Sequence, residues 1–585
     1  MKKYLILLAS SLLAFSSSLT SCTDFFEVES DHVIYADKDH LKNANDSIYS
    51  LIGVLNKLQA IGDRTVLLGE ARGDLMDVTE ATASDLRDVA MFNIGDDNEY
   101  NSPRDYYAVI NNCNYYIANA DTALKNNRNE YLFKSEFAAV KAIRAWTYLQ
   151  LVTTYGKVPF VTEPIMTKEQ AERDYPQYGI REVCDYFINQ DGLYDLVDVD
   201  YPYYGDIKSM PSRLFYIPMY IILGDLNLWG QNYKEAALCY YNYISKRNGN
   251  NSIYPTGTES IQWQNSNWEK GIATANFFPE VISNNAEVIA IIPGDSIPSE
   301  GYYSQLRNTF NSTYDNDYAV SLVPSQSMFD ISAAQVYCHY ENDQVIYAPQ
   351  SIGDHLDGDL RLRLYWSTID NAVNSKGESI TYQSIDKYTS RNIRIYRRQL
   401  IYLRMAEALN CAGYPRFAYQ ILASGINNKI VNDSIMPACH TAADSAFVAQ
   451  FDFPQTRYVL NDPRTEQTSK NTQGIHSRGS GYTQFNEFYP MPYDAGISGA
   501  DSIAQQTAFQ QKAVEDLIID EEALEFAFEG YRFYDLMRAA LRRNDPAYLA
   551  DRIYARRGQG TYSGIEADLY NETNWFLHWN GKIGF

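Results

Sequence analysis

The chain has 585 residues and a formal net charge of −24 at pH 7, and so acidic a surface repels nucleic acids and anionic polysaccharides, because both bind through cationic side chains. Its seven cysteines form no CxxC pair and no histidine stands at metal-ligand spacing, which argues against a zinc site. The 49 tyrosines suit a surface that binds carbohydrate or peptide, although codon usage explains their number equally well.

Residues 1–22 read as a secretory signal peptide that ends at a lipid-carrying cysteine. A short basic start precedes an apolar stretch that is too short for a retained transmembrane helix. The closing Leu-Thr-Ser-Cys resembles the bacterial lipobox, which would make Cys22 the first mature residue. We therefore expect residues 1–21 to be removed and residues 22–39 to form a tether on a stable lipid anchor.

The first predicted helix covers residues 40–60, where apolar residues recur at helical spacing. From residue 62 to residue 102 this periodicity gives way to Gly, Asp and Asn. Polar loops between rigid elements are where binding groups concentrate. We predict that this loop supplies part of a ligand-binding face through Arg72, Asp74, Asn98, Tyr100 and Asn101.

Two strong helices are predicted next, at residues 103–125 and 131–154. The second carries apolar residues along one side and is expected to end at Gly156, because glycine is the usual residue just beyond a helix.

Two later segments predict helical hairpins. Residues 213–244 contain two apolar helices around a turn at 230–232, and residues 397–427 repeat the scheme around Gly413. Small residues such as Gly224 stand where the paired helices must approach closely, and the first hairpin resembles a tetratricopeptide unit. Stacked pairs of this kind form a helical scaffold with a continuous core.

Long irregular stretches separate these hairpins. Residues 246–280 carry Trp263 and Trp268 among polar residues, and Trp366 precedes another turn-rich span. Loops of this length are usually functional or disordered, so we add these three tryptophans to the predicted ligand-binding face. Between them, residues 285–293 predict a buried strand.

Other features predict no chemistry. The stretch DHLDGD at 354–359 has calcium-like character, but its acids stand at positions 1, 4 and 6 instead of the odd positions of an EF-hand, and no metal site is predicted. Cys113, Cys239 and Cys411 stand in apolar helical patterns, where a thiol serves as a small hydrophobe, and an occasional disulfide stays open. The role of residues 425–512 is open too.

Residues 515–538 predict an amphipathic helix that Gly530 ends or kinks. Beyond the glycine stand Arg532, Asp535 and Arg538 in an apolar segment. We predict that these charges pair with Glu525 and Glu529. Such pairs more commonly bridge packed helices than catalyse reactions, so a structural role is expected.

Three segments carry a family resemblance. They are EFAAVKAIRAWTYLQLVTTYGKVPF at 136–160, IYLRMAEALNCAG at 401–413 and LEFAFEGYRFYDL at 524–536. Each resembles a signature of the SusD/RagB family, whose members are nutrient-binding lipoproteins on the outer membranes of Bacteroidetes. The acidic, aromatic TDFFEVE at 23–29 also resembles the start of SusD-like proteins and the surface-export signal of such lipoproteins.

The resemblance implies a mainly α fold: a tetratricopeptide-like helical-repeat scaffold with long irregular insertions and a few short strands. We expect one SusD-like domain over residues 40–585, with an N-terminal part at about 40–245 and a C-terminal part at about 285–585.

The resemblance also implies a function. The protein would face the cell exterior from the outer membrane, capture an oligosaccharide and deliver it to a SusC-like TonB-dependent transporter without chemistry. No cofactor, catalytic residue or nucleic-acid partner is expected, and the membrane would be contacted through the lipid anchor alone.

Three alternatives stay open at this point. A RagB-like protein would hold a peptide on the same aromatic loops, a periplasmic tetratricopeptide scaffold would bind protein partners, and a lipoprotein hydrolase would turn over its substrate. The sequence contains no GxSxG, Walker A or Rossmann pattern in a suitable context, which favours a protein that is not an enzyme.

Overall fold

The computed structural model describes most of the chain from residue 44 onward: residues 44–207, 210–246, 262–264, 267–269, 287–294, 303–311, 320–341, 344–347, 358–373, 377–388, 390–453, 474–481 and 486–583. The predicted signal peptide, Cys22 and the tether lie outside these residues. Within them, no helix combines the length and the apolar character that crossing a membrane requires.

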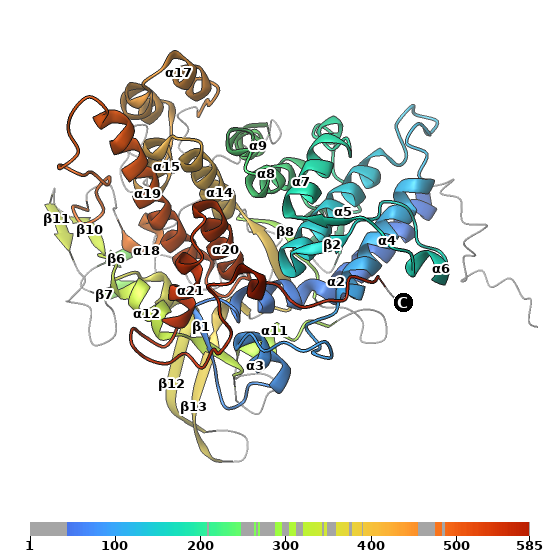
Figure 1. Ribbon diagram of the computed structural model, residues 1–585, viewed down its shortest axis with the longest axis horizontal. Coiled ribbons are helices and arrows are strands. Elements are labelled where there is room, and N and C mark those ends of the chain that lie inside the picture. The colour runs from blue at the N-terminus through green and yellow to red at the C-terminus, as the bar shows by residue number, and fades with distance from the viewer. Residues whose placement is uncertain are drawn as a thin grey trace, which may run out of the picture.

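The first half of the chain is built from helices that pack side by side (Figure 1). They are α2 (Ala44–Glu70), α4 (Pro103–Asn119), α5 (Lys134–Tyr155), α7 (Ile180–Asn189), α8 (Met219–Trp229) and α9 (Tyr233–Lys246). Helix α2 runs ten residues past its predicted end at residue 60, because packing against α4, α5 and α20 buries its last three turns.

The second half contains a matching set of helices: α14 (Arg398–Cys411), α15 (Pro415–Ala423), α19 (Ser502–Phe526), α20 (Arg532–Arg543) and α21 (Ala547–Tyr554). Helix α14 packs against α8 and α9 on one side and against α15 and α19 on the other, so it joins the two halves into one core. The mainly α fold expected from the sequence is confirmed, and so are both predicted hairpins, α8–α9 and α14–α15.

Three glycines lie at the helix end, the turn and the close helix approach that the sequence predicted for them. Gly156 follows the last residue of α5 with φ 74°, and Gly413 takes φ 96° in the turn between α14 and α15. Gly224 faces the ring of Tyr240, where a Cβ would lie 2.5 Å from the ring, so α8 and α9 approach more closely than any larger residue allows.

Short helices and two-stranded antiparallel sheets complete the described part. The central sheet pairs β8 (Val288–Ile292) with β14 (Ile393–Arg397), and both strands are buried throughout, which confirms the predicted buried strand.

The other strand pairs are β1 (Met76–Val78) with β9 (Leu322–Pro324), β2 (Lys157–Pro159) with β3 (Gln177–Gly179), β4 (Asp206–Ile207) with β5 (Met210–Pro211), β6 (Gln262–Gln264) with β7 (Asn267–Glu269), β10 (Cys338–Glu341) with β11 (Gln344–Tyr347), and β12 (Trp366–Val373) with β13 (Ser379–Ile385). The remaining α-helices are α3 (Ser84–Ala90), α6 (Lys168–Ala171), α11 (Leu306–Phe310), α12 (Gln326–Ala333), α13 (Arg361–Tyr365), α16 (Asn428–Ile430), α17 (Ala442–Val448) and α18 (Ser477–Ser480).

The predicted helix at 515–538 is two helices with a break between them. Helix α19 ends at Phe526, Phe528 and Gly530 take φ 72° and 100°, and α20 begins at Arg532. The buried carboxylate of Glu70 accepts the backbone N–H groups of the break, at 2.9 Å from Phe528, 2.7 Å from Gly530 and 3.1 Å from Tyr531. The end of α2 therefore supplies the hydrogen bonds that the interrupted helix cannot make.

Candidate functional site

Two of the predicted ligand-binding residues are buried inside the fold. The Arg72 guanidinium donates to Leu68 O, Trp575 O and Tyr534 OH, at 2.8, 2.8 and 3.1 Å. Asp74 lies 2.6 Å from Arg532, and although burial acts to raise the pKa of Asp74, Arg532 holds that pKa below its usual value. Both side chains are buried and bind the protein's own elements, and Arg72 also lines the groove described below.

The other three residues of that loop shape it and tie it to the C-terminal tail. Asn98 Nδ2 donates to Asp85 O, and its Oδ1 accepts the Tyr100 N–H, both at 2.9 Å. Asn101 Nδ2 donates to Gly95 O at 3.2 Å and to His578 O at 3.1 Å. Asn98 and Asn101 are buried, whereas Tyr100 is half-buried against the core.

The three predicted tryptophans lie elsewhere. Trp263 and Trp268 are register partners in β6 and β7, and their side chains lie outside the described part of the structure. Trp366 begins β12 and packs, half-buried, against the core. Ligand contacts from these tryptophans stay predictions.

A groove of about 810 Å³ opens beside the predicted loop. Its walls come from Phe92 and Ile94 of that loop, from residues 155–157 at the end of α5, and from residues 572–579 of the C-terminal tail. We call it the C-terminal groove. The tail was not predicted as part of a site, although its sequence WFLHW places two tryptophans within five residues after a polar segment.

The tail that forms the main wall is firmly held. Leu577 N–H donates to Thr154 O at 3.0 Å, which joins the tail to the last turn of α5. The indole of Trp575 is fully buried and donates to Leu569 O at 2.8 Å. The Trp579 ring lies 5.6 Å from the rings of both Tyr107 and Tyr155. The groove wall is therefore formed in advance of any ligand.

Two backbone features shape the aromatic surface of the groove. A Cβ at Gly156 would lie 2.8 Å from the Phe576 ring, so this position needs glycine both for its φ and for the ring beside it. Phe92 takes φ 57°, which is rare for a bulky residue, and its ring packs 5.8 Å from that of Phe533. Phe92, Phe576 and Trp579 are all half-buried.

Polar groups surround these rings. Lys157, Thr573, Asn574 and His578 are exposed, and His578 Nδ1 lies 3.0 Å from Asp96 Oδ1. Burial, and then the neighbouring Tyr106, raise the pKa of Tyr155, which keeps this phenol neutral. Apolar rings with a few convergent hydrogen-bonding groups are what a small-molecule site needs, and here they suit a ligand rich in hydroxyl groups.

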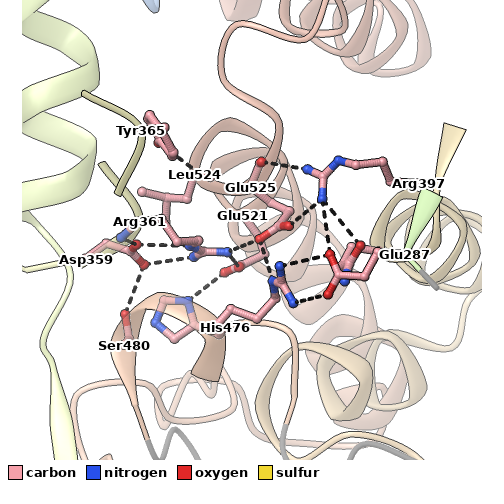
Figure 2. Close-up of polar contacts among 12 residues, drawn as sticks. Glu287, Asp359, Arg361, Tyr365, Arg397, His476, Ser480, Glu521, Leu524 and Glu525 are labelled. Atoms are coloured by element: carbon pink, nitrogen blue, oxygen red, sulfur yellow. Dashed lines mark hydrogen bonds and ion pairs between the residues drawn. The ribbon is translucent and has the colours of Figure 1, made fainter. Parts of the chain in front are cut away.

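Away from the groove, a cluster of buried charges surrounds α19 (Figure 2). Glu525 lies 3.0 Å from Arg361, 3.1 Å from Arg397 and 3.0 Å from Arg478. Burial acts to raise the pKa of Glu525, but the three guanidinium groups hold that pKa well below its usual value. We call these four residues, with Asp359, Glu521 and Glu529 that pair with the same arginines, the α19 ion cluster.

The charges near Gly530 form buried ion pairs, as predicted, but all three have partners other than Glu525 and Glu529. Arg532 pairs with Asp74, and Arg538 pairs with Glu407 at 2.6 Å and with Asp535 at 2.9 Å. The prediction that they pair with Glu525 and Glu529 is wrong, because beyond the break at 527–531 helix α20 packs against α2 and forms its ion pairs with α14.

A histidine, His476, pairs with Glu521 at the edge of the α19 ion cluster, which raises the question of catalysis. His476 Nδ1 lies 2.6 Å from Glu521 Oε2, but Tyr489 stacks on the imidazole at 3.9 Å and all three side chains are buried. The nearby Ser480 hydroxyl bonds to Asp359 instead of to His476. These residues do not form a serine–histidine–acid triad.

Metal and disulfide chemistry are absent from the described residues. No group of three or more His, Cys, Asp and Glu side chains there could hold a metal ion. Cys113, Cys239 and Cys411 carry free thiols in α4, α9 and α14, and burial raises the pKa of each to about 12. They behave as the small hydrophobes that the sequence predicted.

Acid is expected to weaken the fold in a defined pH window. Glu407 is buried against Arg538 and Arg542, and although burial acts to raise its pKa, these arginines lower the pKa to about 2 from the 4.5 of a free glutamate. A folded-state pKa below the unfolded one means that ionised Glu407 stabilises the fold above about pH 4.5. That contribution, on the order of 3 kcal/mol, is lost as the pH falls toward 2.

Urea unfolding at about pH 7, 4 and 3 measures this dependence. Glu407→Gln should lower the free energy of unfolding at neutral pH and make it fall less steeply in acid. Parallel pH profiles for the two proteins would contradict the assignment.

The chain was compared with protein-family models, curated protein sequences and solved structures. Residues 461–577 match the family model described as the SusD family. No curated protein sequence matches the chain.

Among solved structures, a SusD superfamily protein from Bacteroides vulgatus ATCC 8482 matches with a TM-score of 0.52 and 15% identity, over 92% of this chain and 96% of that one. One from Bacteroides thetaiotaomicron VPI-5482 matches with a TM-score of 0.53 and 13% identity, over 89% and 94%. A laminarin-binding SusD-like protein matches with a TM-score of 0.50 and 14% identity, over 90% and 96%.

Packed helical hairpins with short two-stranded sheets set between them define a SusD-like helical fold. The C-terminal part is therefore similar to the SusD family model, and nearly the whole chain shares the fold of SusD superfamily proteins.

Proposed function

We propose that this protein is a surface lipoprotein that captures a neutral oligosaccharide in the C-terminal groove and delivers it, chemically unchanged, to a SusC-like TonB-dependent transporter. The observation that carries the proposal is the groove itself. It combines half-buried aromatic rings with exposed amide, hydroxyl and ammonium groups on a wall that the fold holds rigid. Aromatic rings and hydrogen-bonding groups in one cavity are the usual means of holding a small polar molecule.

The kind of ligand follows from charge and from a structural relative. The strongly acidic chain disfavours anionic polysaccharides, so a neutral glycan is the better partner. One protein of the same fold is described as laminarin-binding, and laminarin is a neutral polymer of glucose. Each stacked ring and each hydrogen bond contributes about 1 kcal/mol, which gives the weak affinity that suits release to a transporter.

The anchor and the location rest on the sequence. The lipobox-like segment supports a lipid anchor on Cys22, and the acidic residues that follow it resemble a surface-export signal. An outer-membrane protein that faces the cell exterior and contacts the membrane through this lipid is therefore proposed. Tyr100, Trp263, Trp268 and Trp366 stay proposed ligand contacts in addition to the groove.

Removing two rings of the groove should abolish most of the binding. Phe576→Ala with Trp579→Ala is expected to weaken binding by about thirtyfold, because two stacked rings at about 1 kcal/mol each contribute about 2 kcal/mol in total. Isothermal titration of the soluble mature chain with laminarin, amylopectin, inulin and an extended peptide measures the change. A thermal melt of each variant checks that the fold is kept.

Phe488→Ala is the matched control, because Phe488 is exposed on the 486–501 segment and lies outside the groove. Unchanged glycan binding in the double variant would overturn the groove assignment. Binding of the peptide alone would replace the glycan by a peptide ligand, and cleavage of the glycan on long incubation would replace capture by catalysis.

A further inference from the structure

A second groove, of about 660 Å³, lies where α7 ends and the α8–α9 hairpin turns. Its walls include Asn189 at the end of α7, Tyr194 just beyond it, Asn227 in the last turn of α8, and Asn232 and Tyr233 at the start of α9. We call it the hairpin-turn groove. Nothing in the predicted ligand-binding face or in the C-terminal groove includes these residues.

The floor of the hairpin-turn groove is a fixed polar network. Asn227 is buried, and its Nδ2 donates to Tyr194 OH at 2.9 Å and to Leu223 O at 2.8 Å. Tyr194 OH in turn donates to Glu235 Oε1 at 3.1 Å. These bonds leave Asn227 Oδ1 as an acceptor with no hydrogen-bond partner in the described part of the chain. Asn227 lines the groove, so this oxygen can accept a hydrogen bond from water or from a ligand there.

The walls carry aromatic rings and amide groups, which are side chains that commonly bind saccharides. Tyr194 and Tyr233 are half-buried and pack on the core, and both line the groove. Asn189 and Asn232 add exposed amides at the rim. Lys234 and Glu235 also line the groove, so the charged side chains there cancel and a neutral ligand is favoured. Two rings, three amides and balanced charges match a hydroxyl-rich, uncharged molecule.

The two grooves lie at opposite ends of one short helix. Gly179, which immediately precedes α7, lines the C-terminal groove, whereas Ile188 and Asn189 at the far end of α7 line the hairpin-turn groove. Helix α7 has ten residues, so it separates the two grooves by about 15 Å at 1.5 Å per residue. A polymer much longer than this distance can occupy both sites, and linked binding of this kind raises overall affinity without any new contact.

We propose that the hairpin-turn groove is a second saccharide-binding site, and that one neutral polysaccharide chain occupies both grooves. This inference rests on the proposed function and makes it more specific: the preferred ligand is a long chain, and affinity rises with chain length beyond what the C-terminal groove alone can bind.

Chain length is the variable that tests the proposal. Laminarin, amylopectin and inulin are each compared with their own trisaccharides by isothermal titration against the soluble mature chain. For the glycan that binds, Tyr194→Ala with Tyr233→Ala should weaken polysaccharide binding at least tenfold and change trisaccharide binding at the C-terminal groove less than twofold. Phe576→Ala with Trp579→Ala should weaken both polysaccharide and trisaccharide binding.

Two further variants keep the test independent of folding. Asn189→Ala with Asn232→Ala changes exposed amides, so it should fold normally and still weaken polysaccharide binding severalfold. Tyr562→Ala removes a tyrosine that is 68% exposed and lies in neither groove, and it should change nothing.

If the wild type and the two variants of the hairpin-turn groove bind polysaccharide with equal affinity, the second site is overturned and the proposed function still stands. If no saccharide of the panel binds the wild-type chain, both proposals fail. Loss of binding to an extended peptide, with saccharide binding unchanged, would assign the groove to peptides and overturn this proposal as well.

Discussion

Glu525→Ala is expected to destabilise the protein by about 3 to 5 kcal/mol, because removing one partner of a buried ion pair leaves the other charge uncompensated. Here the substitution removes one carboxylate partner from three guanidinium groups at once, those of Arg361, Arg397 and Arg478. Their other partners, Asp359, Glu521 and Glu529, soften the loss without removing it. The melting temperature and the urea unfolding curve of the variant measure the effect.

An exposed pair provides the matched control. Glu172 lies 3.6 Å from Lys168 in an i, i+4 arrangement, and its side chain is 62% exposed. Surface pairs of this kind contribute about 0 to 1 kcal/mol, so Glu172→Ala should leave the unfolding curve almost unchanged. If Glu525→Ala were as mild as Glu172→Ala, the α19 ion cluster would not be a structural centre of the fold.

Gly69→Ala should cost about 3 kcal/mol, near the upper end for a substitution that overfills a packed interior. A Cβ at Gly69 would lie 1.9 Å from the carbonyl oxygen of Gly530, and a backbone atom cannot rotate away as a side chain can. The last turn of α2 and the break between α19 and α20 would have to separate. The hydrogen bonds from Phe528, Gly530 and Tyr531 to Glu70 would weaken with them.

The same helix supplies the comparison. A Cβ at Gly53 of α2 meets nothing closer than 3.9 Å, so Gly53→Ala gains helix propensity without a clash. Alanine is better than glycine inside a helix by about 0.5 to 1 kcal/mol, and the melting temperature should rise. A drop in stability of similar size for both variants would argue against the close approach at Gly69.

The helical scaffold could be predicted because its signals are local. Apolar spacing gave the α8–α9 and α14–α15 hairpins, and glycine marked the turn at residue 413 and the end of α5 at residue 156. The end of α2 could not be predicted in the same way. Gly62 and Gly69 suggested a loop, but they let α2 pack closely, Gly62 against Ile393 and Gly69 against Gly530.

The candidate sites depend on contacts between distant parts of the sequence, which residue patterns do not specify. Arg72 and Asp74 stood in a polar stretch that suggested exposure, yet their partners Trp575 and Arg532 lie in the last sixty residues and bury them. Phe92 and Ile94 of the polar stretch line the C-terminal groove, whereas Asn98, Tyr100 and Asn101 do not, and the opposite wall comes from the tail. Nothing local at residues 572–579 indicates that loop as its neighbour.

The hydrogen bonds between the two ends of the chain impose an order on biosynthesis. Arg72 bonds to a residue 503 positions later, and Glu70 bonds to the segment 458 to 461 positions later. The earliest helix emerges from the ribosome long before these partners exist, and it cannot reach its final packing until nearly the whole polypeptide has been synthesised. Stop codons that remove the last few dozen residues should therefore yield an unfolded product, whereas the intact chain reaches its native state only after translation ends.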